Sequence, residues 1–284
     1  MTDERHWEMT SDDATVSGGE KAGSLPFDIT VAHQARMYDY ALGGKDNYAA
    51  DRAAMDAALE IWPDMAFGAR ANRAFLGRAV RHLVMNAGIR QFLDIGTGIP
   101  TAGNTHEVAQ AVAPESRVVY VDYDPVVLAH ARALLDSSEA GATDYIDADL
   151  RNTGEILRRA GQLLDFTEPV AVTLLSILHA IPDPDDPWAI VATVIDAVPS
   201  GSYLAISHSA ADLLTPEALR RLKDTWGSSV QQQLTFRNRE EVARFFAGMD
   251  LVEPGLVPVD EWRAEPAATE TGNSAMWAGV ARKP

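Results

Sequence analysis

The chain has 284 residues, no cysteine and a formal net charge of −17 at pH 7. This charge argues against a nucleic-acid substrate, because phosphate binding needs a positive surface and no cluster of Lys and Arg offsets the acidity. The lack of cysteine excludes disulfides, thiolate metal sites and cysteine nucleophiles, and no long apolar run predicts a membrane segment. We therefore expect a cytoplasmic protein that acts on neither nucleic acid nor membrane.

The sequence divides into three predicted regions. Residues 1–24 are polar and lack periodicity, which indicates a disordered tail. Residues 25–88 are predicted to form an N-terminal helical lid or cap. Residues 89–284 are predicted to form one cofactor-binding domain, since no linker composition interrupts them.

The cap segment has a dense group of polar, aromatic and glycine residues between positions 35 and 52. The pattern predicts a short helix, a turn at Gly43-Gly44 and a second helix from about Tyr48. Such a pair of helices could close over a ligand as a lid, and a solvated surface hairpin would explain the same composition. A longer amphipathic helix is predicted over residues 68–88.

The stretch from residue 90 to residue 135 reads as strand, glycine turn, helix, strand, acidic turn and helix. Gly96 and Gly98 allow the backbone to approach a ligand closely, because a Cβ atom would collide with it. Asp122 stands at the carboxyl end of the second strand. Ligands of open α/β sheets bind at that edge, and an acid there commonly accepts hydrogen bonds from ribose hydroxyls.

The glycine spacing helps to separate two cofactor classes. A dinucleotide fingerprint that starts at Gly96 would require glycine where the chain has Thr101. Pro100 also removes an N–H group that a pyrophosphate would use at the helix start. These two residues weaken an NAD assignment without excluding it.

Further strands are predicted in the second half of the chain. Apolar runs mark residues 145–150, 169–175 and 201–207, each followed by helical patterns. The final runs, 251–259 and 275–281, fit a terminal hairpin. The fold class is thus α/β and Rossmann-like, with a seven-stranded, mostly parallel sheet, helices on both faces and an N-terminal helical lid.

The glycine turn and the acid after the second strand resemble motif I and its acidic follow-up in class I methyltransferases that use S-adenosylmethionine. The resemblance implies a loop under the methionine and ribose parts of the cofactor, an acid on the ribose, and an acid with a backbone N–H at the adenine. By position Asp149 is the acid expected at the adenine, and Asp147 is the alternative. The cofactor-binding residues implied on the sheet are Asp94, Gly96, Gly98, Asp122, Tyr123, Asp149, Leu150 and Ser176.

Three longer segments resemble a family of actinobacterial proteins assigned to the S-adenosyl methyltransferases: ARMYDYALGGKDNYAADR, FLDIGTGIPTAGNTHEVAQ and VVYVDYDPVVLAHARALL. The likeness covers nearly the whole chain after the tail. It implies a methyltransferase fold in which the N-terminal segment is specific to the family. We expect at least one of Arg36, Tyr38 and Asn47 to reach the carboxylate of the cofactor or the substrate.

A base is needed in methyl transfer only when the nucleophile carries a proton that must leave. His179, after the fourth strand, is the catalytic candidate for this role, and His208 is a weaker one. Tyr38 is a second catalytic candidate, on the assumption that the lid closes. The alternatives are a histidine bound to the turn backbone and a structural tyrosine.

The predicted function is methylation of a small molecule by an enzyme that uses S-adenosylmethionine, with no metal, because no His, Asp or Glu group shows ligand spacing. A silent module that binds the cofactor without turnover is one alternative, and an NAD-dependent oxidoreductase is another. The pattern specifies neither the acceptor atom nor the oligomeric state.

Overall fold

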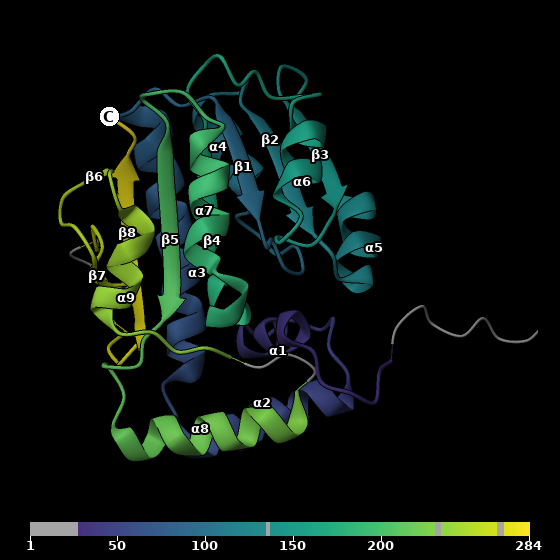
Figure 1. Cartoon of the computed structure of the whole chain (residues 1–284). Helices are drawn as coiled ribbons and strands as arrows, with labels where there is room; N and C mark the ends of the chain where they lie inside the picture. The colour runs from purple at the N-terminus through teal and green to yellow at the C-terminus, as the bar shows by residue number, and fades with distance from the viewer. Residues whose placement is uncertain (1–27, 135–136, 231–233, 266–269) are drawn as a thin grey trace, which may run out of the picture.

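An eight-stranded sheet forms the centre of the computed structural model, which describes residues 28–134, 137–230, 234–265 and 270–284 (Figure 1). The strand order is β3-β2-β1-β4-β5-β8-β6, and β7 pairs with β8. The parallel strands are β1 (Gln91–Ile95), β2 (Arg117–Asp122), β3 (Ala142–Asp147), β4 (Ala171–Leu175) and β5 (Tyr203–Ser209). The antiparallel strands are β6 (Asp250–Leu251), β7 (Val257–Pro258) and β8 (Met276–Arg282).

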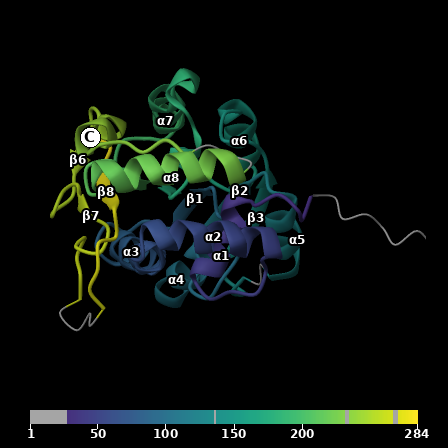
Figure 2. The ribbon, with the colours of Figure 1, turned by 90° about the horizontal axis from the view of Figure 1, so that it is seen from below.

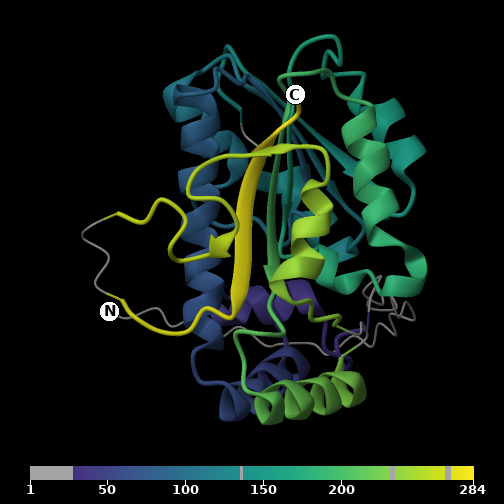
Figure 3. The same ribbon diagram turned by 60° about the vertical axis from the view of Figure 1, so that its left-hand side comes forward.

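The central strands are short and apolar because helices cover both of their faces. Every residue of β1 and β4 is buried, as expected for strands inside a parallel sheet. Figure 3 shows α3 (Met65–Met85) in blue on one side of the sheet and α7 (Pro187–Asp196) in green on the other. The α3 side also carries α4 (Thr105–Val112), and the α7 side carries α6 (Thr153–Ala160), α9 (Arg239–Ala243) and the short 3-10 helix η3 (Arg244–Phe246). The remaining helix of the sheet layer, α5 (Pro125–Leu134), packs on β3.

Three further helices lie below the carboxyl ends of the parallel strands, and we call them the helical cover. They are α1 (Gln34–Ala41), α2 (Ala49–Ile61) and α8 (Pro216–Ser229). Figure 2 shows α8 alongside α2, and the two helices are in contact. An apolar cluster that includes Met37, Met55, Leu222 and Trp226 joins the cover. The chain also forms a bridge between Ala32 and Val230.

The sequence-based expectations are largely confirmed at the level of elements. The α/β class, the helix pair around the Gly43-Gly44 turn and the long third helix are all present. The expected terminal hairpin differs in detail, because its first arm consists of two short strands, β6 and β7, that both pair with β8. The expected tail, 1–24, lies outside the described residues, and the division at residue 88 stays a prediction.

In the part of the chain that the structure describes, no helix is long and apolar enough to cross a membrane. The same residues contain no group of three or more His, Asp or Glu side chains arranged to hold a metal ion.

Candidate active site

The loop after β1 is held by the acid at the end of β2. Gly98 donates its backbone N–H to Oδ2 of Asp122 at 2.9 Å, and Oδ1 of Asp122 accepts the N–H groups of Tyr123 at 2.8 Å and Asp124 at 3.0 Å. Burial raises the pKa of Asp122, and these backbone hydrogen bonds counter that effect. A carboxylate has about four acceptor positions, so Oδ2 keeps capacity for one further donor.

Asp94 has a different environment, although it belongs to the same motif. It is 6% exposed, and its two oxygens accept hydrogen bonds from the hydroxyls of Thr105 at 2.6 Å and Thr173 at 2.7 Å. Burial raises the pKa of Asp94, and the two hydroxyls with the charge of Arg73 offset part of this rise. The side chain thereby ties β1 to α4 and to β4 below the loop.

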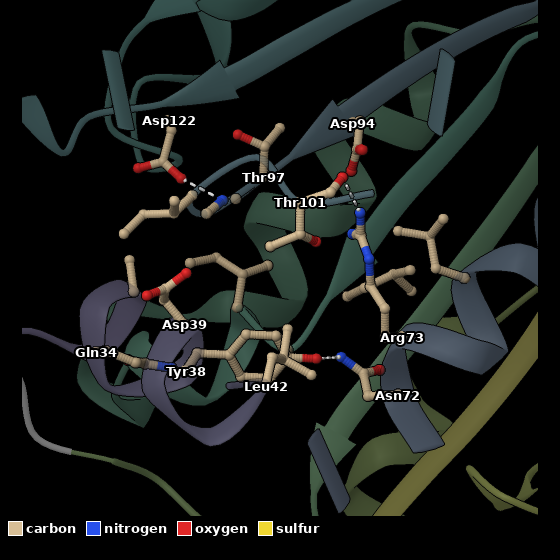
Figure 4. Close-up of a pocket in the computed structure, with 18 of the residues that line it drawn as sticks. Gln34, Tyr38, Asp39, Leu42, Asn72, Arg73, Asp94, Thr97, Thr101 and Asp122 are labelled. Atoms are coloured by element: carbon tan, nitrogen blue, oxygen red, sulfur yellow. Dashed lines mark hydrogen bonds between the residues drawn. The ribbon is translucent and has the colours of Figure 1, made fainter. Parts of the chain in front are cut away.

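A cavity opens between this loop and the helical cover (Figure 4). It encloses about 880 Å³ of space, part of which is open to solvent. Gly96, Gly98 and Asp122 line it from the sheet, and Gln34 and Tyr38 line it from α1. We call it the first cavity.

A second cavity of about 1040 Å³ adjoins the first and shares Gly96, Asp122 and Tyr123 with it. Asp149 and Leu150, after β3, line this second cavity. The Asp149 carboxylate also pairs with Arg151, whose Nη1 lies 2.8 Å from Oδ2. Asp147, the alternative candidate for the acid at the adenine, is exposed and is not among the residues that line either cavity.

Two of the residues expected from the cap segment do not line these cavities. Arg36 is buried against Asp51, with Nε 3.1 Å from Oδ1, and it donates to the carbonyl of Val31 at 2.5 Å. Asn47 donates to Oδ2 of Asp39 at 2.9 Å. Both side chains thus hold the cap segment together, and their predicted contact with the cofactor or substrate has no support from this geometry.

Tyr38, in α1, does line the first cavity, and its hydroxyl points toward Asn72 of α3 (Figure 4). Its hydroxyl donates to the carbonyl of Ala69 at 3.0 Å and accepts from Nδ2 of Asn72 at 2.9 Å, while Oδ1 of Asn72 accepts from Ser207 at 2.6 Å. Burial raises the pKa of Tyr38, and the hydrogen bond from Asn72 lowers it in part. A raised pKa keeps the phenol protonated, and its proton is donated to Ala69, so the catalytic role expected of Tyr38 stays a prediction.

The segment after β4 carries Ser176 and, in the short 3-10 helix η1 (Leu178–Ala180), His179. Ser176 has a φ of 58°, a conformation that costs a residue with a side chain on the order of 1 kcal/mol and that tends to occur at functional sites. His179 is buried between Gln34, whose side-chain amide contacts Nε2, and Ser209, whose hydroxyl lies 3.1 Å from Nδ1. Burial, with the nearby charge of Arg237, lowers the pKa of His179 to about 3.

His208 lies beside His179, with 5.9 Å between the two ring centroids, and forms its own hydrogen bonds. Its Nδ1 donates to the carbonyl of Ser209 at 2.9 Å, and its Nε2 accepts from Nη1 of Arg237 at 2.8 Å. Arg237 also donates to the carbonyls of Leu178 and Ile181 and so anchors the segment after β4. Both ring nitrogens of His208 are thus bound within the protein, and the weaker catalytic role considered for it stays a prediction.

Comparison with known proteins identifies the cofactor class. The model of the S-adenosyl methyltransferase family matches residues 20–284. The chain belongs to this family. A solved DUF574 family protein from Streptomyces avermitilis is similar at 46% identity, with a TM-score of 0.86, over 89% of this chain and 98% of its own.

This methyltransferase is also similar to a solved protein from Thermobifida fusca, at 40% identity and a TM-score of 0.82, over 90% of this chain and 96% of that one. An O-methyltransferase family protein from Burkholderia thailandensis shares only the fold, with 15% identity and a TM-score of 0.50 over 77% of this chain and 58% of its own. No curated protein matches the chain. The chain is a class I methyltransferase with S-adenosylmethionine as its cofactor, which decides between the two cofactor classes that the sequence left open.

The residues of the methyltransferase fit this cofactor, which carries a carboxylate, an ammonium group, ribose hydroxyls and adenine. A Cβ atom on Gly98 would meet nothing within 4 Å, so the loop leaves open space on that side. Asp122 retains an acceptor position beside that space. The first cavity also contains opposite charges, in Asp39 and in Arg73, whose Nε is buried and has no hydrogen-bond partner in the part of the chain that the structure describes.

Sequence reasoning missed two residues that the start of α1 brings into the site, His33 and Gln34. Arg73, near the start of the predicted helix over residues 68–88, was considered as a ligand contact, with a solvated side chain as the favoured interpretation, and it also lines the first cavity. Helical spacing offers a signal for one of the two missed residues, because Gln34, Tyr38 and Leu42 follow at intervals of four and lie on one face, whereas Arg36 lies on another. The N-cap His33 has its Nδ1 2.7 Å from Oδ2 of Asp124, which ties the start of α1 to the end of β2. That contact has no local signal in the sequence.

Proposed function

We propose that this methyltransferase acts on a small molecule and holds its cofactor across the first and second cavities. In this proposal Asp122 accepts the ribose hydroxyls, and Asp149 with the backbone of Leu150 contacts the adenine. Arg73 and Asp39 meet the charged amino-acid end. Support comes from the free acceptor position of Asp122 and from the opposite charges in the first cavity.

The proposal that the methyl acceptor is a small molecule depends on a third cavity. It spans about 580 Å³, part of which is open to solvent, and it shares Gln34, Tyr38 and Ser176 with the first cavity. Residues from all three helices of the cover line it, among them Met37, Met55 and Trp226. Because these residues surround a concave space of this size, a small molecule fits it better than a macromolecule does. When bound, the cofactor supplies an activated methyl group.

His179 and Tyr38 are proposed to position the acceptor. A histidine with a pKa of about 3 remains neutral at pH 7 and accepts a proton poorly, whereas an effective base has a pKa near the working pH. Both ring nitrogens of neutral His179 already contact side chains, Nε2 that of Gln34 and Nδ1 that of Ser209, so His179 orders these two residues at the wall of the third cavity. Tyr38 separates the first and third cavities and aligns Asn72.

Calorimetric titration with S-adenosylmethionine, S-adenosylhomocysteine and NAD tests the cofactor site. The adenosyl ligands are expected to bind and NAD is not. Asp122→Asn removes a charged acceptor, so it should raise the Kd of both adenosyl ligands roughly ten- to hundredfold. Asp147→Asn, an exposed acid on the neighbouring strand, is the matched control and should leave both Kd values unchanged.

The proposal fails at Asp122 if Asp122→Asn binds both ligands as tightly as the natural chain. Lack of binding by folded protein at millimolar ligand would contradict the whole assignment of the first two cavities. Circular dichroism and thermal unfolding of each variant establish that the protein under test is folded.

A further inference from the structure

The third cavity has an apolar wall that is unusually rich in methionine and tryptophan. Met37, Met55 and Met65 line it together with Trp62, Trp226 and Phe236. Methionine side chains adapt to irregular shapes, and their sulfur atoms make favourable contacts with aromatic rings. Tryptophan and phenylalanine add flat surfaces that pack against rings. The wall therefore favours an aromatic molecule over a polar or highly branched one.

The polar groups of the third cavity are uncharged. Of the described residues that line it, none is Asp, Glu, Lys or Arg. The histidine among them, His179, has a lowered pKa and stays neutral at pH 7. A charged ligand would lose its hydration in this space without gaining a partner, which is costly. The chemistry of the wall thus selects an uncharged molecule.

Three residues of the wall each have a buried side-chain polar atom that lacks a hydrogen-bond partner among the described residues. The atoms are Nε1 of Trp62, Nε1 of Trp226 and Oε1 of Gln34. Buried donors and acceptors in folded proteins are nearly always paired, so such atoms at a cavity call for a ligand. An indole N–H can only donate. An acceptor oxygen on a ligand can therefore pair with either indole N–H, and a donor on the ligand can pair with Oε1 of Gln34.

We infer that the third cavity binds an uncharged aromatic molecule that carries a hydroxyl group and a carbonyl oxygen. The hydroxyl faces Gln34, close to the wall shared with the first cavity, and the carbonyl accepts from Trp62 or Trp226. The inference rests on the proposed function, since it takes the third cavity as the acceptor site. It adds a substrate class to that function.

Three naphthols with one hydroxyl and different second substituents test this class by calorimetry, with and without saturating S-adenosylhomocysteine. The probes are 2-naphthol, which lacks a carbonyl, 6-acetyl-2-naphthol, which has a neutral one, and 6-hydroxy-2-naphthoate, which is charged. The ketone should bind about three- to tenfold more tightly than 2-naphthol, the contribution of one hydrogen bond. The carboxylate should bind at least about tenfold more weakly than the ketone, because its charge has no partner.

Phe substitutions identify the donor. Trp226→Phe or Trp62→Phe removes the N–H and keeps an aromatic ring, so one of them should abolish most of the advantage of the ketone and leave the Kd of 2-naphthol within about twofold. Trp188→Phe is the control, since Nε1 of Trp188 donates to the carbonyl of Glu241 and this residue does not line the cavity. It should change none of the three affinities.

The outcomes separate the inference from the function beneath it. Equal affinity for the ketone and the carboxylate overturns the inference, as does an equal loss for all three probes in the tryptophan variants. If S-adenosylhomocysteine binds and no naphthol does at millimolar concentration, the inference is overturned while the proposed cofactor site stands. If the folded protein binds neither, both are overturned.

Discussion

Gly96 and Gly98 both have positive φ angles, of 78° and 63°, but only Gly96 faces a side chain at close range. A Cβ on Gly96 would lie 2.5 Å from Cγ1 and 2.6 Å from Cβ of Ile177, whereas one on Gly98 would meet nothing within 4 Å. Gly98→Ala should therefore cost only the backbone strain, about 1 kcal/mol. Gly96→Ala adds overpacking worth roughly 1 to 3 kcal/mol.

Urea unfolding without ligand checks this pair. The two variants serve as controls for each other, because they share the strain and differ in the contact with Ile177. Equal losses in the free energy of unfolding would show that Ile177 moves aside at little cost.

His179 and His208 give stability a defined pH dependence. Burial lowers the pKa of His179 to about 3 and, with the charge of its neighbours, lowers that of His208 well below its usual value. In the unfolded chain these two histidines take up protons near pH 6.5, and in the folded chain they do not. The stability that the two neutral histidines contribute is thus fully present above about pH 6.5. As the pH falls below this value, the free energy of unfolding decreases by about 1.4 kcal/mol per histidine and pH unit.

The free energy of unfolding should therefore decrease as the pH is lowered from 7 to 5. His179→Asn removes one of the two groups and should flatten the slope by nearly the share of one histidine. An unchanged slope would mean that His179 takes up its proton in the folded state as readily as in the unfolded one.

At the scale of elements, the helical cover depends on the packing of α8 against α2. Leu222, in α8, is fully buried in the cluster that joins the cover, while its neighbour Lys223 is exposed. Leu222→Ala should lower the free energy of unfolding by about 2 to 4 kcal/mol through the cavity that it leaves. Lys223→Ala should change it by less than about 0.5 kcal/mol.

Hydrogen exchange locates the effect of Leu222→Ala. Amides of α1, α2 and α8 should exchange faster, and those of β1 and β4 should keep their protection, because local opening follows the packing of each unit. Uniformly faster exchange would show that the cover and the sheet unfold together.

Most elements could be predicted because their signals are local, although the bounds of some differ: the strand expected over 145–150 is β3, Ala142–Asp147, and the helix expected over 68–88 is α3, Met65–Met85. The capping box at Asn104 and Glu107 and the one at Asn238 and Glu241 both lie in the sequence that they cap. The place of α8 in the cover could not be predicted, because it depends on contacts with α2, which lies far away in the chain. Local patterns define the amphipathic face of a helix and not its partner.

At the scale of the whole molecule, the candidate site also combines residues with a local signal and residues that only packing brings together. The glycine turn and Asp122 were chosen because ligands bind where the carboxyl ends of parallel strands meet at one edge of the sheet, and Asp149 was chosen from the resemblance to class I methyltransferases. All three line the first or second cavity. Arg36 and Asn47 were chosen by residue type, yet the structure uses both inside the cap segment. Gln34 and Arg73 enter the first cavity only through the packing of α1 and α3 against that edge.

The net charge of −17 acts on the molecule as a whole. Like charges on a compact surface repel one another, and the expanded unfolded chain relieves part of that repulsion. Salt shortens the screening length from about 30 Å at 0.01 M to about 8 Å at 0.15 M, so it weakens repulsion between distant charges more than it weakens close ion pairs.

Raising NaCl from low to physiological concentration should therefore increase the free energy of unfolding, by about 1 kcal/mol. Exposed pairs such as Arg158 with Glu155 oppose the trend only slightly, because surface salt bridges contribute little. Urea unfolding at several NaCl concentrations measures the change, and KCl should give the same increase if screening is the cause. A decrease with both salts would show that attraction between neighbouring charges outweighs the overall repulsion in this methyltransferase.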